Sequence, residues 1–424
     1  MTHSTLRCTS TLAAILVALL PILTLTVGGG SGLFYVLSLA CLIIIAVTSA
    51  PQALLSLRPY RWQILTLCLP LVAALLSQYF NHRWSGSETE RGIRIALGYP
   101  LLLAAFLVID PQRLRRAAWA GAMATCLITT GIVAYLAGPA FARPVTPQFN
   151  AVGYGNLMLL VTVLLIYSLG WHLTPRPKAE RILKIVVASL GLAGFVLTQT
   201  RTGWMAIPVF ALIGVALAGW LRHPWRALAA LLGIGLVALA IGASSPALRE
   251  RVVKGAQEIQ QCITVNPTAN TSMCIRLQLW TSAWDMIQLD PWSGIGGGTS
   301  FSHALKERAA AGEVSAYVAR DFGEPHNDIL MALVTYGVPG GVALLALYFV
   351  PAWLFARRLG QQMPQAQRAA AAMGLAVCLG FAVFGLTELM FRGMRSISLY
   401  VILLALFTAL SAPASSQSRN LGPE

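Results

Sequence analysis

Residues 154–172 read YGNLMLLVTVLLIYSLGWH, a run of nineteen residues without aspartate, glutamate, lysine or arginine. A helix needs about 20 consecutive apolar residues to cross the hydrocarbon core of a bilayer. In lipid the backbone must satisfy its own hydrogen bonds, which leaves only helices and closed barrels. Because the run is continuously apolar and lacks the alternation of a barrel strand, it predicts a transmembrane helix.

Similar runs along the chain define the predicted architecture. They lie near residues 10–27, 33–50, 62–80, 93–109, 117–137, 182–198, 203–220, 226–243, 327–355, 368–388 and 393–412. The first run lacks the small-residue cleavage site of a secretory signal, so we interpret it as a retained span. We predict an all-α polytopic membrane protein with about 12 transmembrane helices. Helices 1 to 9 fall in residues 1–243, a loop region with an amphipathic helix in 244–326, helices 10 to 12 in 327–412, and a tail in 413–424.

The composition excludes a water-soluble globular protein. Of the 424 residues, 57% are hydrophobic and 11% charged, and the mean hydropathy is +0.69. Soluble domains carry roughly a quarter charged residues. A net charge of +15 would suggest nucleic acid as a partner of a soluble protein, but here the cations must first be placed relative to the membrane. We therefore expect membrane lipids, and no nucleic acid, among the partners.

The distribution of lysine and arginine predicts the orientation. With a cytoplasmic N-terminus, one face receives sixteen cations and the short loops of the other face receive seven. The seven are Arg83, Arg91, Arg94, Arg143, Arg201, Arg392 and Arg395. Because an excess of cations marks the cytoplasmic side, both termini should be cytoplasmic. The long polar segment 244–325 then lies outside.

That outer segment contains Cys262 and Cys274. In an oxidising compartment two such cysteines can form a disulfide, and the sequence leaves a disulfide and two free thiols equally open. Twelve of the fifteen acidic residues also fall on the outer side, the exceptions being Asp110, Glu180 and Glu424. Charges on this disfavoured side are more often functional than those in solvated loops, so the candidate catalytic residues are expected there.

The first outer cluster is the short turn Thr198-Gln199-Thr200-Arg201-Thr202-Gly203. It places Arg201 at the membrane surface between hydroxyl groups. The alternative is an arginine that only anchors a helix end, although such an anchor would be more usual on the cytoplasmic face.

The second cluster extends from Arg276 to Ser300. Arg276, Trp280 and Trp284 recur every four residues, so they share one face of a predicted amphipathic helix. Asp290-Pro291 should end that helix, and glycines follow at 294, 296, 297 and 298. Such a turn can present backbone N–H groups to an anion, or it can be a simple flexible loop.

The third cluster is Glu324-Pro325-His326-Asn327-Asp328, directly before the tenth run. Proline suits the first turn of a helix, so His326 should lie at the outer N-terminus of a membrane helix. The positive helix end should keep the imidazole neutral and able to accept a proton. The alternative is a helix-capping cluster without chemistry.

Together these clusters favour one reaction type. Arginine is well suited to bind phosphate oxygens in a bidentate manner, and fixed cations stabilise a departing pyrophosphate. A neutral histidine can accept the proton of an attacking hydroxyl. Glu324, His326 and Asp328 could bind a divalent ion, but the arginines would make a metal redundant. We therefore predict transfer from a lipid-linked diphosphate to an alcohol, with no metal and no cofactor.

The motifs resemble a known superfamily. Thr-Arg-Thr-Gly-Trp at 200–204, Arg276-x-x-x-Trp280, Pro-Trp-Ser-Gly-Ile-Gly at 291–296, Pro-His-Asn-Asp-Ile-Leu at 325–330 and Tyr-Gly-Val-Pro-Gly at 336–340 follow in order. Within 194–345 this order resembles the O-antigen ligase and polymerase superfamily, and most closely the O-antigen ligases of Gram-negative inner membranes. Threonines at 198 and 200 replace serines that many relatives carry there.

The resemblance implies a membrane-embedded glycosyltransferase of the GT-C type with one long periplasmic loop. It would move a glycan from undecaprenyl diphosphate to a sugar hydroxyl of lipid A–core at the periplasmic face, inverting and without metal. By this resemblance Arg201 and Arg276 grip the diphosphate and His326 activates the acceptor. Asn327 would orient the histidine or a sugar, and Trp280 would line the substrate site.

Other outer charges remain candidates for contact with the anionic acceptor. Arginines on the outer side would attract phosphorylated lipid A–core. Arg94 is the first candidate because it lies at the start of a span, and Arg91 is the second. For each of Arg91, Arg94, Arg143, Arg392 and Arg395 the alternative is simple solvation of a loop. Glu388 is expected to pair with Arg392, four residues on.

Two alternative functions stay open. An O-antigen polymerase or a protein O-oligosaccharyltransferase would use a similar donor, and the motifs barely distinguish them. A transporter or flippase of lipid-linked glycan belongs to another class. It predicts ionisable residues at mid-membrane depth and a repeat relating two halves, and the sequence has neither feature.

Overall fold

The computed structural model describes residues 2–48, 50–244 and 246–413, and within these ranges every regular element is a helix. The first ten α-helices are α1 (Thr2–Thr26), α2 (Leu33–Thr48), α3 (Ala50–Leu55), α4 (Arg61–Leu67), α5 (Leu69–Phe80), α6 (Gly86–Ala96), α7 (Gly98–Phe106), α8 (Pro111–Ala137), α9 (Ala151–Tyr167) and α10 (Pro177–Leu197). The others are α11 (Arg201–Leu217), α12 (Pro224–Ser244), α13 (Pro246–Thr264), α14 (Ser272–Leu289), α15 (Ser300–Ala310), α16 (Ala316–Asp321), α17 (Asp328–Gly360), α18 (Gln365–Phe384) and α19 (Met394–Leu410). Four short 3-10 turns are η1 (Gly30–Gly32), η2 (Arg58–Tyr60), η3 (Ser168–Gly170) and η4 (Trp220–Arg222).

Each apolar run predicted from the sequence overlaps one or more helices. The run at 368–388 extends beyond the end of α18 at Phe384, and residue 49 of the run at 33–50 lies outside the described residues. Among the described residues, seven segments are long and apolar enough to cross a membrane. They are Ser4–Thr26, Gly30–Thr48, Ala53–Phe80, Pro111–Ala137, Ala151–Gly170, Asp328–Gly360 and Gln365–Phe384. This is the arrangement of a multi-pass membrane protein. The larger number of about 12 crossings and the division of the chain at residue 243 stay predictions.

Two predicted spans are broken into helix pairs. The run at 62–80 divides between α4 and α5, and the run at 93–109 divides between α6 and α7. Pro70 and Pro100 lie just after the two breaks. Because proline has no N–H to donate to the residue four positions earlier, each helix restarts rather than continuing straight.

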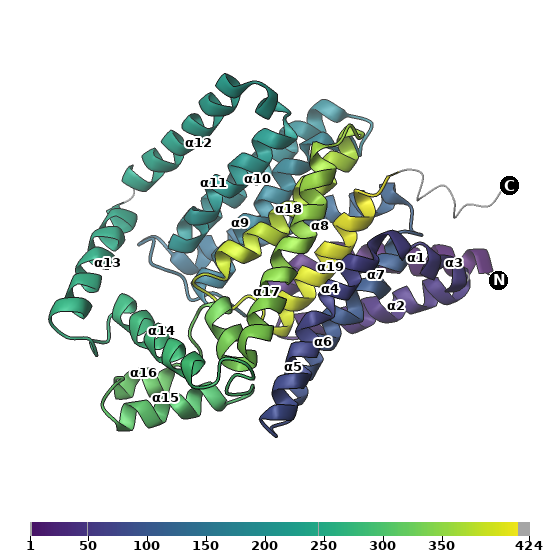
Figure 1. The fold of residues 1–424 in the computed structure, drawn as a ribbon. Helices are drawn as coiled ribbons and strands as arrows, with labels where there is room; N and C mark the ends of the chain where they lie inside the picture. The colour runs from purple at the N-terminus through teal and green to yellow at the C-terminus, as the bar shows by residue number, and fades with distance from the viewer. Residues whose placement is uncertain (1, 49, 245, 414–424) are drawn as a thin grey trace.

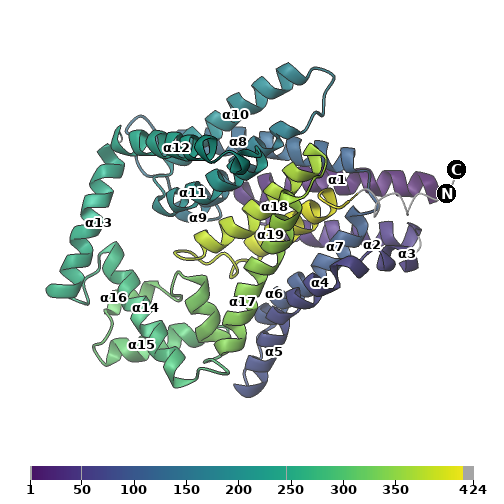
Figure 2. The same cartoon turned by 45° about the horizontal axis from the view of Figure 1, so that its top comes forward.

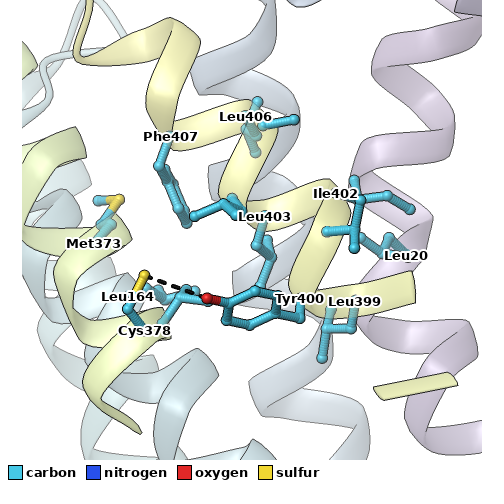
Figure 3. Close-up of a cluster of buried hydrophobic side chains, with 14 of the residues drawn as sticks. Leu20, Leu164, Met373, Cys378, Leu399, Tyr400, Ile402, Leu403, Leu406 and Phe407 are labelled. Carbon is cyan, nitrogen blue, oxygen red and sulfur yellow. Dashed lines mark hydrogen bonds between the residues drawn. The ribbon is translucent and has the colours of Figure 1, made fainter. Parts of the chain in front are cut away.

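The centre of the bundle is occupied by α19 (Figures 1 and 2). Every residue from Ser396 to Leu410 is buried, as expected for a helix that is apolar on all sides. Figure 3 shows Leu399, Leu403 and Phe407 of this core, where Tyr400 points toward Cys378 of α18. Tyr400 also donates a hydrogen bond of 2.6 Å to the carbonyl of Leu347 in α17.

The outer region consists of α13 to α16, which lie beside the start of α17 at the lower left of Figure 1. Their small core includes Leu279 of α14, Leu305 of α15 and Val318 of α16, and it is closed by Val334 of α17. A helix, α14, lies where the amphipathic helix was predicted, and the region packs onto α17. The amphipathic character of this helix stays a prediction.

The glycine-rich turn fastens this region to a kink in α17. Gly337 has φ 67° and interrupts the helix, and a side chain there would collide with the backbone of Trp292. Ile295 N–H donates to the Val334 carbonyl at 2.8 Å, and Val338 N–H donates to the Pro291 carbonyl at 2.7 Å. The turn at 291–298 is thus a tight packing element and not a flexible loop. The N–H of Gly298 in it donates to the carboxylate of Glu88 at 3.1 Å, so the turn does present a backbone N–H to an anionic group of the protein.

Candidate active site

Arg201 is the first residue of α11 and follows a rigid turn. The Thr198 hydroxyl donates to the Phe195 carbonyl at 2.7 Å and lies 2.6 Å from the Thr200 hydroxyl. Thr200 in turn donates to the carbonyl of Ala151 at 3.1 Å. Both hydroxyls are buried, so they fix the backbone that carries Arg201 instead of facing a ligand.

A cavity of about 460 Å³, here called the arginine cavity, lies between α11, α13 and α14. Arg201 and Arg276 both line it, together with Arg143, Val152, Gln199, Thr202, Glu250, Lys254, Glu258 and Ser272. Four cations and two carboxylates therefore surround one space. An excess of fixed positive charge in a confined cavity suits an anionic ligand.

The α13 wall of this cavity is built around Gly255. A Cβ atom at residue 255 would lie 2.7 Å from Nη1 of Arg201, so α13 passes directly against the guanidinium. A disulfide between Cys262 and Cys274 joins α13 to α14, with the two Cα atoms 5.4 Å apart. The sequence left open whether these cysteines form a disulfide or remain free thiols, and the structure has the disulfide. The bond connects the two helices that carry Lys254 and Arg276.

A second cavity of about 400 Å³, the histidine cavity, adjoins the start of α17. Its charged lining consists of Glu324, His326, Glu388, Arg392 and Arg395. His326 has φ 48°, a left-handed conformation that is uncommon for residues other than glycine. Its ring makes an edge contact with Phe322 at a centroid distance of 5.8 Å.

Glu388 lies between the two cavities. One of its carboxylate oxygens is 4.0 Å from Nη2 of Arg276, and the other is 3.6 Å from Nδ1 of His326. The side-chain amide of Asn150 donates to that second oxygen at 2.9 Å. Arg201 and Arg276 thus share one cavity, and Arg276 and His326 share one carboxylate, so the structure brings all three predicted residues together.

Glu388 also changes the protonation expected for His326. Burial lowers the pKa of the imidazole, but the proximity and charge of Glu388, with a smaller contribution from Glu324, raise the pKa above its usual value. The sequence-based expectation considered only the helix end. His326 actually precedes the N-cap residue Asn327, and its ring faces a carboxylate, which favours the proton.

The cluster at 324–328 holds the segment 385–393 in place. The Asn327 amide donates to the carbonyl of Leu386 at 3.0 Å, and its oxygen caps α17 by accepting from Ile329 and Leu330. The Asp328 carboxylate accepts the N–H groups of Met390 and Phe391 at 3.0 and 3.2 Å. Helix capping is therefore real, and it serves to position Glu388.

Comparison with known proteins shows a family resemblance. Residues 185–345 match the family model described as O-antigen ligase. This segment is similar to the O-antigen ligase family. The chain is also 25% identical over 281 residues to an uncharacterized protein of Haemophilus influenzae, an alignment that covers 64% of this chain and 67% of that protein.

The matched O-antigen ligase segment contains Arg201, Arg276 and His326 but neither Asn150 nor Glu388, which complete the site from outside it. The prediction that Glu388 pairs with Arg392 is wrong. Segment 385–393 is not helical, so a spacing of four does not bring Glu388 to Arg392. Arg392 instead pairs with Glu324 at 3.1 Å and lies 3.4 Å from Glu88. The sequence feature that could have identified Glu388 as a site residue is its position as an acidic residue next to an apolar span.

Two candidate substrate residues outside the matched segment form contacts with protein groups. Arg94 is buried, pairs with Glu90 at 2.6 Å and donates to the Ser398 hydroxyl at 2.7 Å. Arg91 pairs with Glu88 and donates to the carbonyl of Arg392 at 2.8 Å. Arg91 thus supports the backbone of Arg392. Contact of Arg91 and Arg94 with the acceptor stays a prediction.

Trp280 and Asn327 are likewise committed to internal contacts. The Trp280 indole donates to the Pro325 carbonyl at 2.9 Å, which ties α14 to the residue before His326. Glu324, His326 and Asp328, the set considered for a metal, point to Arg392, Glu388 and Tyr348 respectively. Within the described ranges no group of three or more potential ligands gathers.

Proposed function

We propose that this chain transfers a glycan from undecaprenyl diphosphate to a sugar hydroxyl of lipid A–core, at the periplasmic face of a bacterial inner membrane. The observation that carries the proposal is a pair of cavities linked by an ion pair between Arg276, which lines one, and Glu388, which lines the other. One contains the two candidate phosphate-binding arginines and the other contains a candidate base. The GT-C classification and the inverting, metal-independent course belong to the same proposal.

The arginine cavity would hold the donor diphosphate. Arg201 and Arg276 approach it from α11 and α14, and their guanidinium groups match the oxygens of a phosphate pair. As the bond from the anomeric carbon to the diphosphate breaks, the electron pair stays on the leaving oxygen. Cations fixed before the reaction stabilise that growing charge without reorganising.

The histidine cavity would hold the acceptor sugar. Nδ1 of His326 faces Glu388, which leaves Nε2 for the acceptor hydroxyl. The hydroxyl oxygen forms the new bond to the anomeric carbon while its proton passes to Nε2, and diphosphate departs from the opposite side. A single displacement of this kind inverts the anomeric centre. Glu388 would fix the tautomer and strengthen the base.

Transfer with purified components tests the proposal. The full chain is supplied with undecaprenyl diphosphate-linked glycan and either lipid A–core or a serine-containing peptide. We expect glycan on lipid A–core, with a loss of roughly 10²–10⁴-fold in His326→Ala. The control is His303→Ala, because His303 is an exposed residue of α15 outside both cavities.

Each other outcome has a defined meaning. Elongation of the peptide would identify a protein O-oligosaccharyltransferase, and elongation of the donor glycan alone would identify a polymerase. Unchanged transfer by His326→Ala would eliminate the histidine as base. Movement of lipid-linked glycan across the vesicle membrane without any glycan transfer would support a flippase.

A further inference from the structure

A third cavity, larger than the arginine cavity and the histidine cavity, lies toward the other ends of α11 and α17. It has a volume of about 780 Å³ and is formed by the ends of α11 and α17, the turn η4 and the start of α18. The helices α11 and α17 begin at the active site with Arg201 and Asp328 and end at this cavity. Val209 is the lining residue of α11 nearest to Arg201 in sequence, eight residues away. At 1.5 Å per residue, about 12 Å of helix separates Arg201 from the near edge of the cavity.

The cavity has an apolar floor and a cationic rim. Leu212, Leu375 and Leu379 contribute to the floor, and Arg222 and Arg368 line the same space. Leu212 is 50% exposed and Leu221 is 56% exposed, which is the surface expected of a groove open to lipid. No carboxylate lines the cavity.

Arg368 is held in position without being neutralised. Its guanidinium donates to the carbonyls of Ala216 and Leu217 at 3.2 and 3.1 Å. Both carbonyls lie at the end of α11, where Ala216 also accepts the N–H of Gly219 at 3.0 Å. Arg222 is exposed at the rim. Among the described residues neither arginine forms an ion pair with a carboxylate.

Neighbouring side chains mark the depth of a lipid headgroup layer. Trp220 and Trp225 are 41% and 81% exposed, and Arg357 stacks on the exposed Trp353 at 4.7 Å. Tryptophan is enriched at membrane–water interfaces. By the distribution of cations this end of the molecule is the predicted cytoplasmic one.

We propose that this groove is a binding site for an anionic glycerophospholipid of the leaflet opposite the active site. Acyl chains would lie along the leucines of α11 and α18, and the phosphate would sit between Arg222 and Arg368. Basic pockets between membrane helices on the cytoplasmic side bind such headgroups. The two arginines at the rim should favour a lipid with a net negative headgroup over a zwitterionic lipid. The proposal does not depend on the proposed transferase activity.

Native mass spectrometry of the full chain in detergent tests this site. Phosphatidylglycerol and phosphatidylethanolamine with identical acyl chains are titrated separately. We expect tighter binding of phosphatidylglycerol, and a Kd about fivefold weaker in Arg222→Ala, the change expected for one cation near an anionic headgroup. The matched control is Arg357→Ala, which removes a cation from the same end but outside the groove.

A second variant keeps the test decisive if Arg222→Ala folds poorly. Leu212→Trp fills the apolar floor and should weaken both lipids to a similar extent. Equal affinity of the unmodified chain for the two lipids would overturn the proposal. Equal effects of Arg222→Ala and Arg357→Ala, or unaltered binding to Leu212→Trp, would overturn it as well.

Discussion

Replacing Gly255 by alanine should impair glycan transfer while leaving the fold intact. The Cβ atom of the new residue would lie 2.7 Å from Nη1 of Arg201, whereas ordinary contacts begin at 3.4 Å. Nη1 must therefore retreat by about 0.7 Å, since repulsion rises steeply inside contact distance. The displaced atom is the tip of a flexible side chain, so the movement costs activity and not folding.

The size of the effect follows from that displacement. A misplacement of about 1 Å can cost 10²-fold in rate, so we expect kcat/KM for transfer to fall by roughly 10–100-fold. Alanine favours a helix interior over glycine by about 0.5–1 kcal/mol. The thermal unfolding midpoint of Gly255→Ala should thus stay the same or rise.

The assay measures kcat/KM with purified substrates together with the thermal unfolding midpoint. Gly233→Ala is the matched control, because Gly233 lies in α12 with open space around the position of a Cβ atom. Full activity of Gly255→Ala would refute the requirement for a precisely held Arg201. In an Arg201→Lys background the alanine should add little, because the two changes act on the same contact.

Further predictions concern the charged groups of the site. Arg201→Lys and Arg276→Lys keep the positive charge but lose the two-pronged guanidinium that binds phosphate oxygens in a bidentate manner. Each should therefore lower kcat/KM for transfer by at least tenfold, about 1.4 kcal/mol. Near-normal rates in both variants would mean that the two arginines only anchor helix ends at the membrane interface. Glu388→Gln removes the carboxylate that raises the pKa of His326. A general base acts unprotonated, so the acidic limb of the pH profile should move to lower pH while the maximal rate falls. An acidic limb that stays at the same pH in Glu388→Gln would show that Glu388 does not influence the general base.

The helical fold was accessible from the sequence because apolar periodicity and length decide it. Runs such as 154–172 and 393–412 became α9 and α19, and the former was also among the segments long enough to span. The breaks at Cys68 and Leu97 were missed although proline lies two or three residues beyond each. A hydropathy pattern does not register a missing hydrogen-bond donor.

The site was accessible only in part, because its residues come from separate segments of the chain. Residue type and side of the membrane were sufficient to select Arg201, Arg276 and His326. Glu388 was noticed but assigned to a neighbour in sequence, since nothing in the chain shows that 385–393 folds back onto Asn327 and Asp328. The same limitation explains Arg94, whose contacts with Ser31 and Ser398 come from distant segments.

Backbone strain gives an independent reason to locate function at this end of the molecule. Five non-glycine residues in the described ranges have positive φ, namely His82, Phe141, Gln148, Gln199 and His326. All five lie in the loops at the end that carries Arg201 and His326, and two of them are His326 itself and a neighbour of Arg201. Such conformations cost about 1–3 kcal/mol each and persist where the surroundings enforce them. Gln199 lines the arginine cavity, and Gln148 and His326 line the histidine cavity. Three of the five residues with positive φ therefore lie at the two cavities, whereas His82 and Phe141 line neither.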